Sequence, residues 1–219
     1  MKIFLDTANL VTIKKWAETG LIDGVTTNPT HLSKEGKDPK KQVLAICKVL
    51  PDGFISVEVT EKEPQKIYTQ AKKIADLAEN IVVKIPCHKD YVEIIHKLTQ
   101  EGIALNITLV FSLPQAYLMS KLGVTFISPF VGRLDDSGVD GCAVLEQIQR
   151  MVTDNVFDTQ VIAASIRNMH HFHAAIAAGV DVVTLPAEVL EKSLGHILTD
   201  EGIAKFDADW QKLGIKQFP

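Results

Sequence analysis

Short runs of β-branched and apolar residues alternate along this 219-residue chain with amphipathic segments, and this alternation limits the possible folds most. Eight runs have the length and composition of buried strands: 3–6, 25–27, 55–59, 81–85, 103–108, 125–128, 161–165 and 180–185. Between them, apolar residues recur at helical spacing, which predicts helices over 64–78, 89–100, 113–122 and 142–152. The order of elements is therefore strand, helix, strand, helix.

Strands that alternate with helices require right-handed crossovers and a mostly parallel sheet. Eight such units, about 25 residues apart, favour a closed (β/α)₈ TIM barrel over an open doubly wound sheet. No Pro/Ser-rich tract or break in composition divides the chain, so we predict a single domain over 1–219. A last amphipathic segment, 199–213, follows the eighth unit, and it is a candidate to pack on a neighbouring subunit.

Charge and cysteine content limit the partners of the chain. The net charge is −4 and no basic run is present, which argues against nucleic acid or an anionic membrane as the main partner. We find no cleavable leader and no apolar stretch long enough to span a bilayer, so we expect a cytoplasmic protein that acts on a small molecule. Cys47, Cys87 and Cys142 lack CxxC spacing, and we expect neither a disulfide nor a structural metal.

Lys84 lies inside the β-branched run 81–86, where a charged amine is unusual. Burial disfavours the ammonium form, so such a lysine is a candidate nucleophile for Schiff-base chemistry. The alternative is a lysine near a strand end that extends its charged group to water and has no chemical role.

Polar residues at the other strand ends share the inward face with Lys84. Side chains alternate along a strand with a period of two, so this face can be followed from strand to strand. The residues that we place at the barrel mouth are Asp6, Asn28, Glu58, Asn106, Thr108, Ser128, Phe130, Ser165 and Arg167. Two of them have simpler interpretations, because Asp6 is also a candidate helix cap and Asn28, before a proline, is typical of a turn.

Arg133, Ser165 and Arg167 form a second candidate group, because two guanidinium groups and a hydroxyl are suited to a phosphate dianion. The alternative is surface arginines in salt bridges. The chain contains neither GxGxxG after a strand nor GxxxxGK[ST], so a phosphorylated sugar fits better than a nucleotide, and we expect no cofactor.

Two groups of metal-type residues are discounted. His170, His171 and His173 crowd one predicted helix start, but only the first and third have a helical ligand spacing. The three aspartates at 135, 136 and 140 lack the spacing of a calcium loop, and we predict that they lie in a solvated loop.

Seven blocks along the chain, taken together, resemble the transaldolases, and the length resembles the small subfamily that includes fructose-6-phosphate aldolases. The blocks are DGVTTNPT (23–30), SVEV (56–59), IVVKIP (81–86), NITLVFS (106–112), SPFVGRLDD (128–136), AASIRN (163–168) and DVVTLP (181–186). The resemblance implies a (β/α)₈ barrel, no cofactor or metal, and a homo-oligomer of five or ten subunits.

The resemblance also implies a role for each candidate residue. Lys84 would form the Schiff base, Asp6 would act as acid and base, and Glu58 with Thr108 would hold a catalytic water. Asn28, Asn106 and Ser128 would position sugar hydroxyls, and Arg133, Ser165 and Arg167 would bind phosphate.

The activity implied is transfer of a dihydroxyacetone unit between sugar phosphates in the pentose phosphate pathway. Aldolases of this subfamily have tyrosine and glutamine at the positions of Phe130 and Glu58, so this chain resembles the transferases there. The alternatives are a fructose-6-phosphate aldolase and a non-catalytic barrel that binds phosphosugars.

Overall fold

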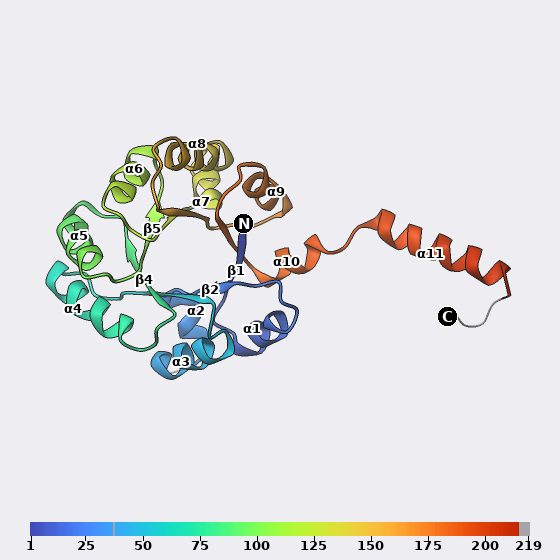
Figure 1. The fold of residues 1–219 in the computed structure, drawn as a ribbon, viewed down its shortest axis with the longest axis horizontal. Helices are drawn as coiled ribbons and strands as arrows, with labels where there is room; N and C mark the ends of the chain where they lie inside the picture. Colours follow the sequence, from blue (N-terminus) through green and yellow to red (C-terminus); the bar gives the residue numbers. More distant parts are fainter. Residues whose placement is uncertain (37, 215–219) are drawn as a thin grey trace.

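The computed structural model describes residues 1–36 and 38–214, and within them eight parallel strands close into a barrel (Figure 1). The strands are β1 (Lys2–Asp6), β2 (Gly24–Thr26), β3 (Phe54–Glu58), β4 (Ile81–Pro86), β5 (Leu105–Val110), β6 (Phe126–Pro129), β7 (Gln160–Ala163) and β8 (Val182–Leu185). Each strand pairs with the next in sequence, and β8 pairs with β1. The predicted (β/α)₈ TIM barrel is confirmed.

Helices surround the strands in a ring (Figure 1). They are α1 (Leu10–Ala17), α2 (Pro29–Lys34), α3 (Pro39–Val49), α4 (Pro64–Ala75), α5 (Val92–Gln100), α6 (Leu113–Lys121), α7 (Val131–Asp136), α8 (Gly141–Asp154), α9 (Met169–Ala177) and α10 (Ala187–Ser193), with a 3₁₀ turn over Lys89–Tyr91. A further helix, α11 (Ile197–Lys212), lies outside the ring. Several begin with proline just after a capping side chain, as α2 does after Asn28 and α3 after Asp38. The predicted strands and helices lie within three residues of the observed ones.

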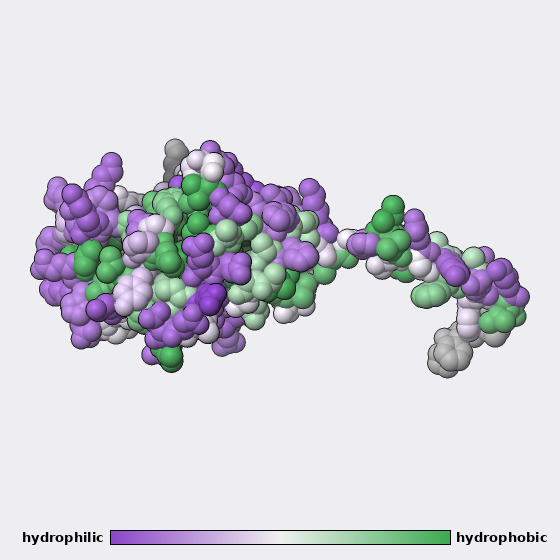
Figure 2. Space-filling view, turned by 90° about the horizontal axis from the view of Figure 1, so that it is seen from above, coloured by the Kyte–Doolittle hydropathy of each residue, from purple (hydrophilic) through white to green (hydrophobic). Residues whose placement is uncertain are grey.

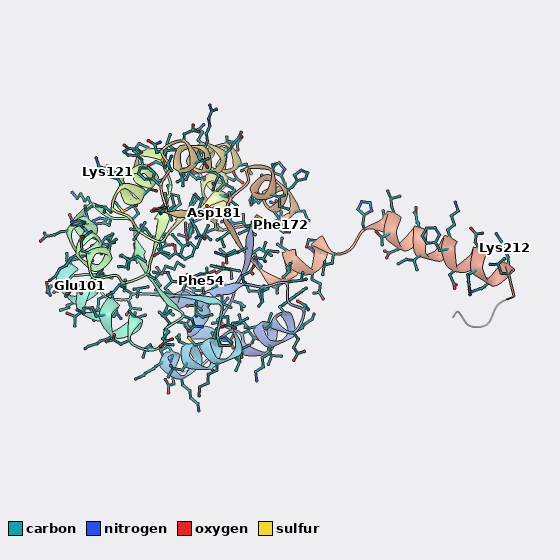
Figure 3. All side chains as sticks on the ribbon, in the orientation of Figure 1. Phe54, Glu101, Lys121, Phe172, Asp181 and Lys212 are labelled. Carbon is teal, nitrogen blue, oxygen red and sulfur yellow. The ribbon has the colours of Figure 1, made fainter. Side chains whose placement is uncertain are left out.

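The barrel interior is apolar at its amino-terminal end. Phe4, Val82, Phe126, Ile162 and Val182 form one buried cluster there, and the labelled Phe54 lies near the centre of the ring while Glu101 and Lys121 lie at its outer edge (Figure 3). Because inward side chains alternate along each strand, the next inward positions lie above this cluster, toward the carboxyl ends. The apolar layer is therefore the floor of the polar site described below.

The helix α11 stands away from the barrel as an arm (Figures 1 and 2). None of its residues is buried, and its apolar side chains include Ile203, which is 61% exposed, and Phe206, which is 74% exposed. The predicted segment 199–213 is thus helical and lies outside the barrel. Among the described helices, none is long and apolar enough to cross a membrane.

Candidate functional site

A pocket opens at the carboxyl ends of the strands, the end at which barrels of this class carry their sites. Its lining comprises Asp6, Thr26, Asn28, Lys84, Ser128, Phe130, Arg133, Ala164, Ser165 and Thr184. Seven of the predicted site residues are in that lining. Glu58, Asn106 and Thr108 lie on the strands beside Lys84, and Arg167, which is outside the lining, forms an ion pair with Asp136.

Lys84 is only 5% exposed, so its amine does not extend into bulk water. Its Nζ lies 3.2 Å from Glu58 Oε2 and donates to the backbone oxygen of Thr27 at 3.1 Å. The amine therefore has one carboxylate oxygen and one backbone oxygen within contact distance. Lys84 and Glu58 were both predicted site residues, and the structure brings them into a direct ion pair.

A chain of buried hydrogen bonds lies on the strands around Lys84. Ser128 donates to Asn106 Oδ1 at 2.7 Å, and Asn106 Nδ2 donates to Ser56 Oγ at 3.2 Å. Among the described residues, the buried hydroxyl of Thr108 has no hydrogen-bond partner. A buried polar atom without a partner is unusual, and it is available to a water or a substrate atom.

Asp6, at the end of β1, lines the same pocket. Its Oδ1 accepts a hydrogen bond from Thr26 at 2.9 Å and lies 3.5 Å from His31 Nε2. Burial raises the pKa of the Asp6 carboxyl, but the hydrogen bond and charge of His31, the charge of Lys84 and the hydrogen bond from Thr26 together bring that pKa below its ordinary value. The side chain is therefore a carboxylate at neutral pH.

Asp6 was also a candidate helix cap, and Asn28 a candidate turn residue. The cap of α1 is Asn9, whose side chain accepts from the Thr12 amide, so Asp6 does not cap that helix. Asn28 caps α2 by accepting from the His31 amide at 2.8 Å, and it also lines the pocket. Capping uses its oxygen, so its amide nitrogen remains available to a ligand.

Of the three residues predicted to bind phosphate, two line the pocket and one does not. Arg133 and Ser165 line the pocket, and the Arg133 guanidinium lies 5.0 Å from the centre of the Phe130 ring. Arg167 instead forms a two-point ion pair with Asp136, as in the alternative of surface salt bridges. Strand alternation does not bring Ser165 inward, because Ile162 is the inward residue of β7; a left-handed backbone at Ser165, with φ of 59°, turns it to the pocket.

Two further polar residues at the site were not predicted from the sequence, besides Thr26 and Ala164 of the lining. Thr184 on β8 shares a 2.6 Å hydrogen bond with Thr26, and His31 on α2 lies beside Asp6. The first is two residues after the inward Val182 and could have been found by alternation. The second depends on how α2 folds back over the barrel mouth, for which the local sequence carries no signal.

The aspartates and histidines that were discounted as metal ligands make other contacts. The first two aspartates are exposed, as predicted, but they lie at the end of α7 and not in a loop, and they form ion pairs with His171 and Arg167. Asp140 caps α8 by accepting from the Ala143 amide. In the part of the chain that the structure describes, no three His, Cys, Asp or Glu side chains are grouped to hold a metal ion.

The chain is similar to known proteins over nearly its full length. The family model described as transaldolase/fructose-6-phosphate aldolase matches residues 3–216. A probable transaldolase of Dehalococcoides mccartyi is 48% identical over 214 residues, which cover 97% of this chain and 99% of that protein. Similar proteins with the same description come from Thermodesulfovibrio yellowstonii, 46% identical, and Methanococcus maripaludis, 44% identical; they cover 97% and 96% of this chain, and 99% and 98% of their own lengths.

Proposed function

The chain belongs to the transaldolase/fructose-6-phosphate aldolase family, and from this premise we propose that it is a transaldolase. It would transfer a dihydroxyacetone unit from sedoheptulose 7-phosphate or fructose 6-phosphate to glyceraldehyde 3-phosphate or erythrose 4-phosphate. This is a reaction of the cytoplasmic pentose phosphate pathway. The observation that carries the proposal is the buried amine of Lys84, which has Glu58 at 3.2 Å and shares one pocket with Asp6.

The first half of the reaction joins the ketose to Lys84. After Glu58 takes its proton, the neutral amine attacks the ketose carbonyl, and loss of water from the adduct leaves an iminium ion. The orphaned Thr108 hydroxyl and Glu58 lie on the strands that flank β4, so they are well placed to hold a water for this step. Asn28, Asn106 and Ser128 would bind the sugar hydroxyls.

The second half breaks and remakes a carbon–carbon bond. Asp6 takes the proton of the C4 hydroxyl as the bond between C3 and C4 breaks, and the iminium ion accepts the electron pair. A three-carbon enamine remains on Lys84 while the aldose leaves. The enamine then attacks the acceptor aldehyde, whose oxygen takes the proton back from Asp6, and an iminium ion is left on Lys84. Addition of water to this iminium ion releases the product ketose and restores the amine.

Phe130 favours the transferase over the aldolase, because an enamine must survive until the acceptor arrives. The ring lines the pocket, packs against Phe111 at 5.9 Å between ring centres, and carries no donor. An apolar ring cannot protonate the enamine, whereas the tyrosine of the resembling aldolases can. Phosphate binding by Arg133 and Ser165, with Arg167 close by, would select phosphorylated sugars.

The transferase and the aldolase are separated by one assay. We expect fructose 6-phosphate to be consumed rapidly only when erythrose 4-phosphate is present, and Phe130→Tyr to raise the release of free dihydroxyacetone about tenfold by supplying a proton donor. Release is measured by a coupled dihydroxyacetone assay, and Phe111→Tyr, beside Phe130 but outside the pocket lining, is the control. Equal release with and without acceptor in the wild type would identify an aldolase.

We further propose that α11 packs on a second copy of this chain in a homo-oligomer. Ile203, Phe206 and Trp210 recur at helical spacing on one side of α11, together with Leu213 just after its end, and these residues define the apolar stripe of the arm. An arm with such a stripe and no buried residue is typical of a segment that is covered in an assembly. Five or ten subunits is the state that the family resemblance implies.

Phe206→Asp is expected to reduce the assembly to smaller species, because it places a charge in the centre of the apolar stripe. The mass is measured by light scattering during size-exclusion chromatography. Ala208→Asp is the matched control, since position 208 lies on the opposite side of α11 and the added charge is the same. A monomeric wild type, or identical masses for both variants, would rule out this role of α11.

A further inference from the structure

Two adjacent aspartates at the end of α7 both act on Arg167. Asp136 meets the Arg167 guanidinium end-on, with Nη1 to Oδ1 at 2.5 Å and Nη2 to Oδ2 at 2.6 Å. Asp135 lies 2.7 Å from His171 Nε2, and His171 Nδ1 in turn accepts a hydrogen bond from the backbone amide of Arg167 at 3.3 Å. One aspartate thus holds the side chain of Arg167, and the other holds its main chain through an imidazole.

His171 is suited to be a fixed bridge. It is 4% exposed, and Asn168 accepts from its backbone amide at 2.9 Å, which fixes the start of α9. Because Nδ1 accepts a hydrogen bond, the proton of the neutral ring is on Nε2 and points to Asp135. Asp135 is itself held, since its Oδ1 accepts from the Gly141 amide at 2.9 Å.

The first turn of α7 supports the same segment from the pocket side. The Gly132 amide donates to the Ser165 backbone oxygen at 3.1 Å, beside the left-handed residue Ser165. A Cβ atom at Gly132 would lie 2.8 Å from Arg167 Nε and 2.9 Å from its Cδ. The Arg167 side chain therefore runs along α7, with its Nε end close to Gly132 and its far end on Asp136.

We propose that Asp135 and Asp136 are positioning residues that aim Arg167 at the substrate phosphate. The fork with Asp136 uses one N–H of each terminal nitrogen, which leaves the Nε edge, next to Gly132 and Ser165, for the phosphate. The ion pair itself is half exposed on both sides, and such pairs contribute little to folding stability. The inference rests on the proposed function only in that a phosphorylated sugar is the ligand.

Asp136→Asn tests whether Asp136 positions the side chain of Arg167. We expect the affinity for inorganic phosphate, measured by calorimetry, to fall about tenfold, and KM for fructose 6-phosphate to rise by a similar factor with kcat within about twofold. The transfer rate is also compared for two donors, fructose 6-phosphate and fructose, with glyceraldehyde as the acceptor for both, so that only the phosphate of the donor differs. The loss of rate caused by Asp136→Asn should be at least about fivefold smaller with fructose. Asp136→Glu, which keeps the charge, should recover part of the affinity.

Asp154→Asn is the matched control, because Asp154 also pairs with an exposed arginine, Arg150, on the outer helix α8, and the charge change is the same. It should leave phosphate affinity unchanged. Tighter phosphate binding by Asp136→Asn would overturn the proposal, since Asp136 would then compete with the phosphate. Equal losses on both donors would overturn it as well. If the wild type fails to form an adduct with any ketose, the proposed function fails, while the phosphate titration still tests the inference.

His171→Phe tests whether Asp135 and His171 position the main chain of Arg167. Phenylalanine keeps an aromatic ring but loses the contacts of the imidazole with the Arg167 amide and with Asp135. We expect a larger loss of transfer rate with fructose 6-phosphate than with fructose, as for Asp136→Asn. Thermal unfolding of the variant shows whether the barrel is intact. A folded variant with unchanged phosphate affinity would remove Asp135 and His171 from the proposal.

Discussion

Lys84→Met is expected to reduce dihydroxyacetone transfer by about four orders of magnitude or more, the range seen when a covalent nucleophile is lost. Methionine is similar in length to lysine and suits a side chain that is 5% exposed, so the barrel can keep its packing while the amine disappears. The measurement is borohydride reduction in the presence of fructose 6-phosphate. In the wild type, mass analysis of the peptides should show the three-carbon unit on Lys84.

Stability is the second readout for this variant. Removing the lysine leaves the Glu58 carboxylate, which is 15% exposed, without its partner. This should reduce the free energy of unfolding by about 3 kcal/mol. For a chain of this length, such a loss lowers the melting temperature by about 6–12 °C. Adding Glu58→Gln should recover most of the melting temperature and none of the activity. An adduct on another lysine, or a variant that keeps its transfer rate, would contradict the assignment of Lys84.

Much of the site follows from strand alternation alone. Asp6, Glu58, Lys84 and Asn106 lie at inward positions because each strand of a parallel barrel presents every second residue to the interior. The run around Lys84 is apolar on both faces, so the inward placement of Lys84 depended on the polar residues at the ends of the other strands. The inward polar residues could therefore be predicted without any knowledge of the contacts among them.

The phosphate side of the pocket could not be predicted in the same way. Ser165 enters the pocket through a left-handed backbone, which is unusual for a residue with a side chain and has no local signature in the sequence. Arg167 meets Asp136 across 31 positions of the chain, and that contact exists only once α7 lies against the end of β7. Local patterns predict elements and faces, whereas such pairings depend on how the loops pack.

The surroundings of the Lys84 amine depend on a contact between two strands. Its Nζ lies 3.2 Å from Glu58 Oε2, and the two residues are register partners on β4 and β3. Both residues could be predicted from the sequence, but their direct contact could not. In the proposed mechanism the amine loses its proton across this contact, between neighbouring residues of β4 and β3.

Asp6→Asn is expected to slow transfer by about 10²- to 10⁴-fold while Lys84 still forms its adduct with fructose 6-phosphate. Both described contacts of the carboxylate fall on Oδ1, from Thr26 at 2.9 Å and His31 at 3.5 Å, and no hydrogen bond from a described residue reaches Oδ2. Oδ2 is thus the atom that can accept the C4 hydroxyl proton. An asparagine keeps an acceptor for Thr26 but cannot take that proton.

The adduct trapped by borohydride should accordingly change from the three-carbon unit to the intact six-carbon ketose, because the variant stalls before the carbon–carbon bond breaks. Thr26→Val is the companion variant: it removes one hydrogen-bond donor to Asp6 but keeps the base, so its loss of transfer rate should be much smaller.

The folded pKa of Asp6 lies below its ordinary value. The ionised side chain therefore stabilises the fold at pH values above the pKa of the unfolded chain, and this contribution is lost as the pH falls through the folded pKa. The acid limb of the wild-type transfer rate should therefore lie below the ordinary pKa of aspartate. A three-carbon adduct in Asp6→Asn, formed at the wild-type rate, would show that another group takes the C4 proton.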